Sequence, residues 1–155
     1  MEPIKMMYIT DRELTDLAVT RTIEEVVEIA LAVLERMPQP VRWVAGPITS
    51  GERTPEENRR RLHRTILRYK EGGVATFNYL PFQRRAIQIL SRAKRENVQE
   101  RLRDELYAPI FKSGKIAELR IMPNSDASLN VYWMWGFASA EGIPIRFIPR
   151  ELVPR

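Results

Sequence analysis

The sequence predicts an α/β fold, namely a Rossmann-like (flavodoxin-like) parallel sheet with helices on both faces and an extra N-terminal helix. The first observation is order: after residue 40, short apolar runs alternate with longer segments of helical periodicity. Such alternation favours parallel strands joined by right-handed crossovers. The second observation is that the predicted strands are apolar on both sides, as strands covered by helices on both faces are. The third is that 155 residues, 44% of them hydrophobic, suffice for a real core.

The N-terminal helix is predicted over residues 22–36. Thr22 can cap its first turn and Glu25 stands where a capping box places a carboxylate. One stripe at helical spacing is apolar, comprising Ile23, Val26, Val27, Ala30, Val33 and Leu34. The sequence PQP at 38–40 ends the helix.

The next three elements form a strand–helix–strand unit. Residues 41–45 (VRWVA) predict a strand, and GPITSG at 46–51 predicts a turn. A helix then starts after Thr54, with Pro55 in its first position, and runs to about Lys70 before two glycines stop it. VATFNYL at 74–80 predicts the second strand.

The remaining elements follow the same alternation. Two helices are predicted, at 81–94 and at 98–111, and Pro109 should break the second. A strand at 116–122, a helix at 128–141 and a strand at 143–148 complete the pattern. We therefore expect an acidic extension with one helix at 1–40, one domain at 41–150 and a tail at 151–155.

The charge of the chain is unevenly distributed. Residues 1–40 hold four Lys/Arg and eight Asp/Glu, whereas the rest holds 21 and 12. A basic body can indicate nucleic-acid binding. Pairing of the acidic segment with the basic body, within the chain or in an oligomer, is the favoured interpretation, because no compact Lys/Arg block with interleaved aromatics is present. Nucleic acid is not among the partners expected.

The residue types restrict the chemistry and the compartment. The chain has no cysteine and one histidine, His63, which excludes disulfides and cysteine nucleophiles and argues against a protein-only transition-metal site. Neither a metal nor a cofactor is expected. No apolar run is long enough for a signal peptide or a membrane span, so a cytoplasmic protein without membrane contact is expected.

Two loops at predicted strand ends carry the candidate binding residues. Small residues and a following helix N-terminus can hold a phosphate or sugar, although a plain turn explains the same pattern. In the first loop these residues are Gly46, Pro47, Ile48, Thr49, Ser50 and Gly51. In the second, MPNSDAS (122–128), the polar residues are Asn124, Ser125, Asp126 and Ser128. Ser125 or Asp126 can cap the next helix, which leaves the others unexplained.

Four segments in this order resemble the nucleoside 2-deoxyribosyltransferase-like superfamily, which includes deoxynucleoside 5′-monophosphate N-glycosidases. They are VAGPITSG, FNYLPF, LYAPIFKSGKIAELRIMPNSDAS and SLNVYWMWGFASAEGIPI, and the resemblance covers residues 41–148. It implies that Asn78, Tyr79 and Phe82 line the base side of a nucleoside site. It also implies a homo-oligomer, because relatives often assemble with sites near subunit interfaces.

The resemblance places the family nucleophile at a residue that cannot serve. Relatives commonly show a serine, a glycine two residues later and a nucleophilic glutamate six residues after the serine. Carried over, the serine is Ser128, the glycine falls on Asn130 and the glutamate on Met134. A thioether cannot attack an anomeric carbon. Met134 and the nearby tryptophans can equally be ordinary core or interface residues.

Three functions follow as hypotheses. The first is a nucleoside- or nucleotide-binding relative without the usual glycosyl transfer. The second is an active N-glycosidase or deoxyribosyltransferase that uses a displaced carboxylate, Asp126 or Asp104. The third is an oligomeric protein-interaction module whose contact is the aromatic cluster at 132–135.

Overall fold

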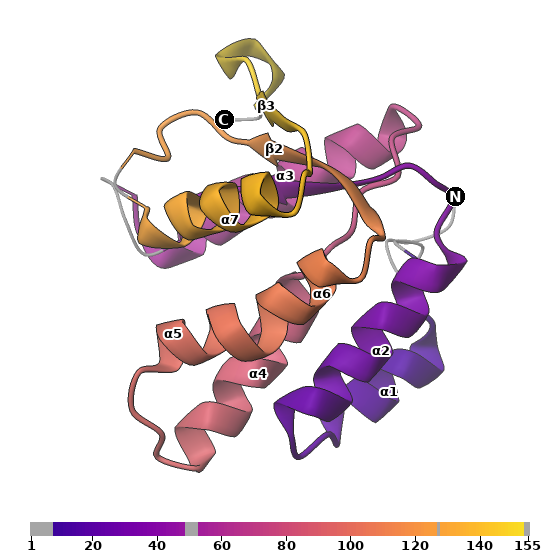
Figure 1. Cartoon of the computed structure of the whole chain (residues 1–155), viewed down its shortest axis with the longest axis vertical. Helices are drawn as coiled ribbons and strands as arrows, with labels where there is room; N and C mark the ends of the chain where they lie inside the picture. The colour runs from indigo at the N-terminus through magenta and orange to yellow at the C-terminus, as the bar shows by residue number, and fades with distance from the viewer. Residues whose placement is uncertain (1–7, 49–52, 127, 154–155) are drawn as a thin grey trace. The chain divides into compact units, whose positions relative to one another are not determined.

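The computed structural model describes residues 8–48, 53–126 and 128–153 (Figure 1). The chain forms two compact units: a helical unit, residues 1–38 with 79–115, and a sheet unit, residues 39–78 with 116–155. The chain crosses between them three times, so neither unit is continuous in sequence. The assignment of residues 41–150 to one domain stays a prediction. None of the helices in the described ranges combines the length and apolar character needed to cross a membrane.

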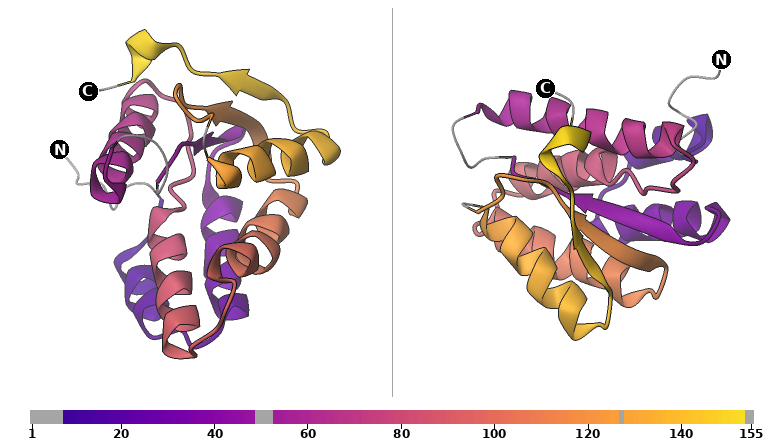
Figure 2. Two further views of the ribbon diagram at one scale, coloured as in Figure 1. Left: turned by 90° about the vertical axis from the view of Figure 1, so that its left-hand side faces the viewer. Right: turned by 90° about the horizontal axis from the view of Figure 1, so that it is seen from above.

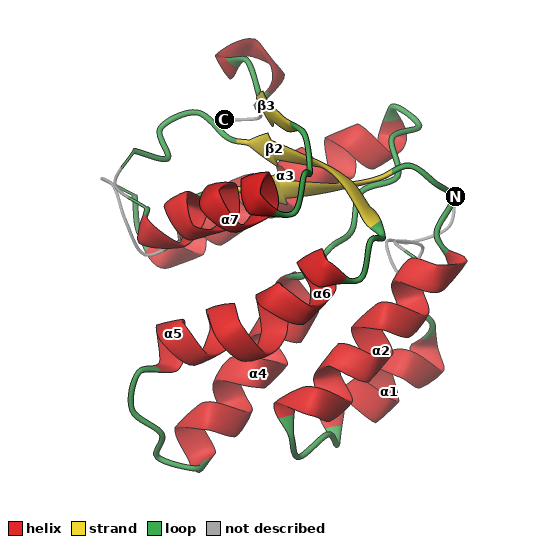
Figure 3. Cartoon of the chain, in the orientation of Figure 1, coloured by secondary structure: helices red, strands yellow, loops and turns green. Residues whose placement is uncertain are grey.

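The helical unit is built around α2 (Ile23–Arg36), the helix predicted at 22–36. Thr22 caps it as expected, through a hydrogen bond that its Oγ1 accepts from the Glu25 amide. Helix α2 packs on α4 (Leu80–Arg92) (Figure 3). It also packs on the helical run at residues 98–112, which follows α4 in the chain. A further short helix, α1 (Asp11–Ala18), packs on α2 and α4. The prediction of a single helix before residue 40 is therefore wrong.

The predicted break at Pro109 is wrong, because the helical run passes through this residue with a change in its hydrogen bonding. The run comprises α5 (Val98–Arg101), the π-helical η2 (Leu102–Tyr107) and α6 (Ala108–Lys112), so it continues through Pro109. Proline lacks an amide donor and its ring crowds the carbonyl four residues earlier. A π-helical turn is one way in which a helix accommodates such a disturbance.

A buried arginine ties α4 to the turn between α1 and α2. Arg85 is 9% exposed, and its guanidinium donates to the Thr20 carbonyl at 2.5 Å and to the Thr20 hydroxyl at 3.2 Å. A third bond reaches the Gln88 side chain at 3.0 Å. Thr20 is itself buried and cannot bond to water, so Arg85 supplies hydrogen-bond donors to its carbonyl and hydroxyl oxygens.

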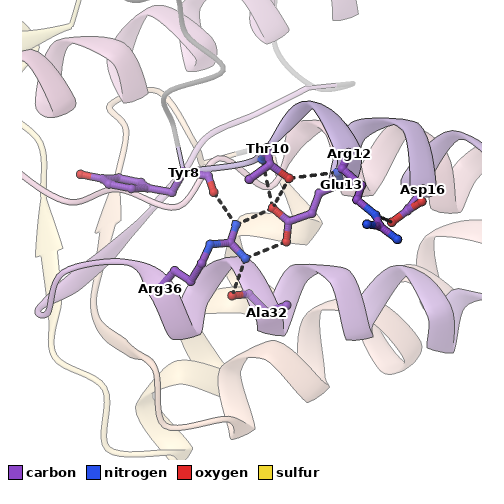
Figure 4. Close-up of polar contacts among 7 residues, drawn as sticks. All are labelled: Tyr8, Thr10, Arg12, Glu13, Asp16, Ala32 and Arg36. Carbon is purple, nitrogen blue, oxygen red and sulfur yellow. Dashed lines mark hydrogen bonds and ion pairs between the residues drawn. The ribbon is translucent and has the colours of Figure 1, made fainter.

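A second polar cluster fixes the start of α1 (Figure 4). Arg36 donates to both carboxylate oxygens of Glu13, and to the carbonyls of Tyr8 at 2.7 Å and Ala32 at 3.3 Å. The Glu13 carboxylate also accepts from the amide and hydroxyl of Thr10. The hydrogen bond from Arg36 lowers the pKa of Glu13, against the opposing effect of burial.

The Glu13–Arg36 pair should make the stability of the helical unit pH-dependent. Because the folded pKa of Glu13 is depressed, its contribution is present above the unfolded pKa of about 4.3 and is lost as the pH falls through the folded pKa. Glu13→Gln should therefore cost about 1–2 kcal/mol at pH 7 and much less at pH 3. Urea unfolding of both proteins at the two pH values tests this. An equal difference at both pH values would contradict it.

The sheet unit contains the parallel sheet that the sequence predicts. Strand β1 (Val41–Ala45) pairs with β2 (Ile116–Ile121), which pairs with β3 (Ile145–Phe147), all parallel in the order β1-β2-β3. The described strands confirm the predicted parallel neighbours at 41–45, 116–122 and 143–148.

The strand predicted at 74–80 is reduced to a single parallel bridge between Thr76 and Arg42. The Arg42 amide donates to the Ala75 carbonyl at 2.8 Å, and the Arg42 carbonyl accepts from the Phe77 amide at 2.9 Å. Pairing stops there because α4 begins at Leu80, with Pro81 in its second position. The bridge still shows which edge of the sheet this segment occupies, namely beside β1.

The helices of the sheet unit lie on opposite faces of the sheet. Helix α3 (Pro55–Glu71) packs against β1, whereas α7 (Leu129–Ala140) packs against β2 and β3 (Figure 2). The strands between them bring Val41, Trp43, Val44 and Leu119 to full burial. The predicted α/β, Rossmann-like fold class is therefore confirmed.

Candidate functional site

The two predicted binding loops begin side by side at the carboxyl edge of the sheet. Ala45 at the end of β1 is in register with Ile121 at the end of β2. One step further, the Met122 amide donates to the Ala45 carbonyl at 2.8 Å. The expected juxtaposition of the two loops thus holds at their described starts. Thr49, Ser50 and Gly51 lie outside the described residues.

The gap between these loops is a topological switch point. From β1 the chain passes through α3 to the Thr76 segment on one side of β1, whereas from β2 it passes through α7 to β3 on the other side. The connections therefore leave in opposite directions and over opposite faces of the sheet. In open α/β sheets ligands bind in the crevice outside the carboxyl ends of the strands at such a point.

Gly46 is required by packing. A Cβ atom on Gly46 would stand 2.5 Å from the Met122 Sδ and 3.3 Å from its Cγ, and Met122 is 2% exposed. The small size of this residue, interpreted from the sequence as room for a ligand, is thus used by the side chain of Met122.

This contact predicts strong coupling between the two residues. Gly46→Ala should destabilise the protein by about 1–3 kcal/mol, because it overpacks a filled site. In a Met122→Ala background the same change should cost less, by a coupling energy of about 0.5–3 kcal/mol. Chemical unfolding of the wild type, the two single variants and the double variant measures this coupling energy. Strict additivity would show that Met122 moves aside freely.

The described start of the first loop is held by α3. The Ile48 carbonyl accepts from the side-chain amide of Asn58 at 2.8 Å, and Pro47 is buried. Thr54 caps α3 by accepting from the Glu57 amide at 3.2 Å. Pro55 has no amide hydrogen, so the N-terminus of α3 offers an anion fewer donors than the sequence pattern indicates.

The second loop uses both of its serines internally. The Ser125 hydroxyl donates to the Met122 carbonyl at 2.7 Å, and the Ser128 hydroxyl caps α7 by accepting from the Val131 amide. The exposed polar groups are Asn124, which has a positive φ of 62°, and Asp126. The cap of α7 is therefore Ser128, so the expectation of Ser125 or Asp126 is wrong, and Asp126 keeps an exposed carboxylate.

An arginine that the sequence analysis missed reaches this loop. Arg150 donates from Nη2 to the Asn124 side-chain oxygen at 3.1 Å, and both residues are exposed. It lies at the start of η3 (Arg150–Leu152), just beyond the carboxyl end of β3. The sequence signal was available, because a cation following the last strand of a parallel sheet projects at the same edge as the other loops.

Helix α7 buries the residue at the position of the family nucleophile. Met134 is 3% exposed and shares the sheet-facing stripe with Val131 and Ala138. Asn130 is half-buried near the start of the helix. Met134 therefore performs the packing role that the sequence analysis gave as its alternative interpretation.

One flank of α7, beside β3, is exposed and aromatic. The rings of Tyr132 and Trp135 stack with centroids 6.3 Å apart, and Trp135 meets Phe147 of β3 edge-on at 5.2 Å. Tyr132 and Phe147 are 51% and 61% exposed. The predicted aromatic cluster is thus a surface feature, extended by Phe147.

Three predicted site residues belong to the helical unit. Tyr79 and Phe82 are each 1% exposed, and Tyr79 meets Tyr107 edge-on with ring centroids 6.1 Å apart. Burial raises the pKa of Tyr107 to about 12. Asp104 is exposed on η2. Asn78, the last residue of its segment in the sheet unit, is half-buried.

The remaining titratable groups do not form a metal centre in the described part of the chain, where no group of three or more His, Asp or Glu side chains could hold an ion. His63 is half-buried on α3, and burial lowers its pKa.

No family model, no curated protein and no solved structure matches this chain.

Proposed function

We propose that the sheet unit binds a nucleoside or nucleotide at the switch point between β1 and β2 and lacks the usual glycosyl transfer. The supporting observation is the topology, because β1 and β2 lie side by side and their connections diverge. The family resemblance of the motifs supplies the ligand class. The loss of transfer rests on the burial of Met134.

Arg150 suggests how a phosphate would be held. It is the exposed cation whose side chain reaches the loop after β2, and a guanidinium suits phosphate oxygens. Asn124 already orients this side chain. The proposal therefore favours a 5′-monophosphate over the free nucleoside.

Calorimetric titration with deoxynucleosides and their 5′-monophosphates tests the proposal. Arg150→Gln should weaken monophosphate binding about 10- to 100-fold and leave nucleoside binding unchanged, since it removes one charge-assisted interaction. Arg146→Gln is the matched control, because Arg146 lies on β3, where it donates to Glu118 at 3.0 Å. Amide resonances of Gly46, Ile48, Met122 and residues 124–128 should shift on binding. Shifts confined to residues 79–115 would contradict the proposed site.

An active N-glycosidase is the alternative, with Asp126 of the sheet unit or Asp104 of the helical unit in place of the nucleophile. Chromatography of deoxynucleosides and deoxynucleoside monophosphates incubated with the protein should show no release of free base. Release that disappears in Asp126→Ala would establish the alternative.

The exposed aromatic surface supports a second role, as a homo-oligomer contact. Tyr132, Trp135 and Phe147 present contacting rings on the surface, and such residues are enriched in interfaces. Sedimentation of the wild type and of Trp135→Lys tests this role. A shift from dimer to monomer is expected, and a monomeric wild type would exclude it.

A further inference from the structure

The outward side of α3 carries four exposed cations. Arg59, Arg60, Arg64 and Arg68 are all exposed, and we refer to them as the α3 arginine surface. Residues 58–70 contain six Lys/Arg and no Asp or Glu. The carboxylates of this helix stand in its first turn and at its last residue.

Three of these arginines lack a carboxylate partner in the described part of the chain. Arg59, Arg60 and Arg68 form no ion pair within the described residues. The acidic N-terminal segment pairs inside the helical unit, and one of its pairs reaches Lys115 of the basic body, as the sequence analysis favours. Its Glu13 binds Arg36, and its Glu35 lies 2.8 Å from Lys115.

The half-buried carboxylate of the central strand β2 is also paired with other cations. Glu118 on β2 pairs with Arg120, with Arg146 and, at 3.9 Å, with Arg42. The spacing within α3 is unfavourable to the helix itself, because like charges at i and i+4 destabilise it by about 0.2–0.5 kcal/mol per pair. Two such pairs are present, Arg60 with Arg64 and Arg64 with Arg68. An external polyanion would remove this repulsion.

The distribution of charge around α3 indicates the shape of that polyanion. At 100° per residue, Arg59 and Arg68 lie on opposite flanks of the helix, and Arg60 and Arg64 lie between them. The buried residues Asn58, Leu62, Thr65 and Ile66 occupy the other side. The major groove of B-form DNA admits an α-helix, and a phosphate strand borders it on each side.

Other polyanions fit the surface less well. An interfacial helix inserts apolar side chains into the bilayer, and the exposed large hydrophobic residues of the sheet unit lie on α7, β3 and η3. Single strands are held by exposed aromatic platforms. The one aromatic residue on α3, Tyr69, is half-buried beneath the Arg120 guanidinium, 4.8 Å from the ring centroid. The major groove of duplex RNA is too deep and narrow for this contact.

We propose that the α3 arginine surface binds the sugar–phosphate backbone of double-stranded DNA, with α3 in the major groove and without base specificity. This surface is separate from the candidate nucleotide site, so either proposal can fail alone.

Fluorescence anisotropy with a labelled 20-base-pair duplex of random sequence, titrated between 50 and 200 mM salt, tests the proposal. Arg60→Gln/Arg64→Gln/Arg68→Gln should lower the slope of log K against log salt by about 2.7, since each phosphate contact contributes about 0.9. The matched control is Arg84→Gln/Arg92→Gln/Arg95→Gln, which removes the same charge from exposed positions of the helical unit. It should keep the wild-type slope.

Three outcomes would overturn the proposal. They are no duplex binding at 50 mM salt, equal slopes for the two triple variants, and equal binding to phosphatidylserine vesicles or to the single strand. His63 adds a local readout, because the chain has one histidine and it lies on α3. Nearby phosphates favour the protonated imidazole, so bound duplex should raise the pKa of His63 in a proton NMR titration. An unchanged pKa with duplex bound would place the contact elsewhere.

Discussion

Met134→Glu is expected to unfold much of the protein rather than to restore a glycosidase. Met134 is 3% exposed on the side of α7 that packs on β2 and β3. An unpaired carboxylate there should cost about 3 kcal/mol or more. Met134→Leu keeps volume and polarity and should cost less than about 1.5 kcal/mol. Urea unfolding of both variants, together with a base-release assay, checks the expectation.

The pH dependence of Met134→Glu distinguishes burial from a simple loss of packing. Burial raises the folded pKa of the new carboxyl above its unfolded value of about 4.3. Its penalty should therefore be small near pH 4 and grow as the pH rises toward the folded pKa. Met134→Gln has no titrating group, so its cost in unfolding free energy should be the same near pH 4 and at higher pH. A well-folded Met134→Glu that releases base would show that the pocket is intact.

Arg85→Met is expected to be the most damaging single change in the helical unit outside its apolar core. It keeps the bulk of the aliphatic stem but leaves the buried carbonyl and hydroxyl of Thr20 without the guanidinium donors. Losing these bonds should cost about 3 kcal/mol, since hydrogen bonds to a charged group each contribute about 1.5–3 kcal/mol and the stem still packs.

The comparison for Arg85→Met is Arg84→Met, because Arg84 is the exposed neighbour on the same helix. That change should alter the free energy of unfolding by no more than about 0.5 kcal/mol. Equal effects of the two substitutions on thermal unfolding would show that the Arg85–Thr20 contacts do not stabilise the fold.

Local chemistry explains which elements could be predicted. Thr22 and Thr54 each accept the hydrogen bond from a helix amide that their sequence position predicts. The same logic would have found α1, where Thr10 and Glu13 form a full capping box. The strand at 74–80 was overestimated because an apolar run shows burial and does not show how many residues pair.

The candidate site was harder to predict because its residue types have two uses. Serines at a strand end serve as ligands or as caps, and Ser125 and Ser128 are both engaged with the backbone. Aromatic residues after a strand stack on bases or fill cores, and Tyr79 and Phe82 are buried. Only the tertiary structure separates these uses, as it does for Gly46 beneath Met122.

The crossing of the chain between its two units has a consequence for synthesis on the ribosome. Strand β1 is complete at residue 45, and its partner β2 begins at residue 116. At translation rates of about 5–20 residues per second, β1 waits roughly 4–14 s for that partner. During this interval the apolar segment VRWVA has only the Thr76 bridge to occupy its edge. The nascent chain is therefore most exposed to aggregation, and most in need of chaperones, before residue 116 is made.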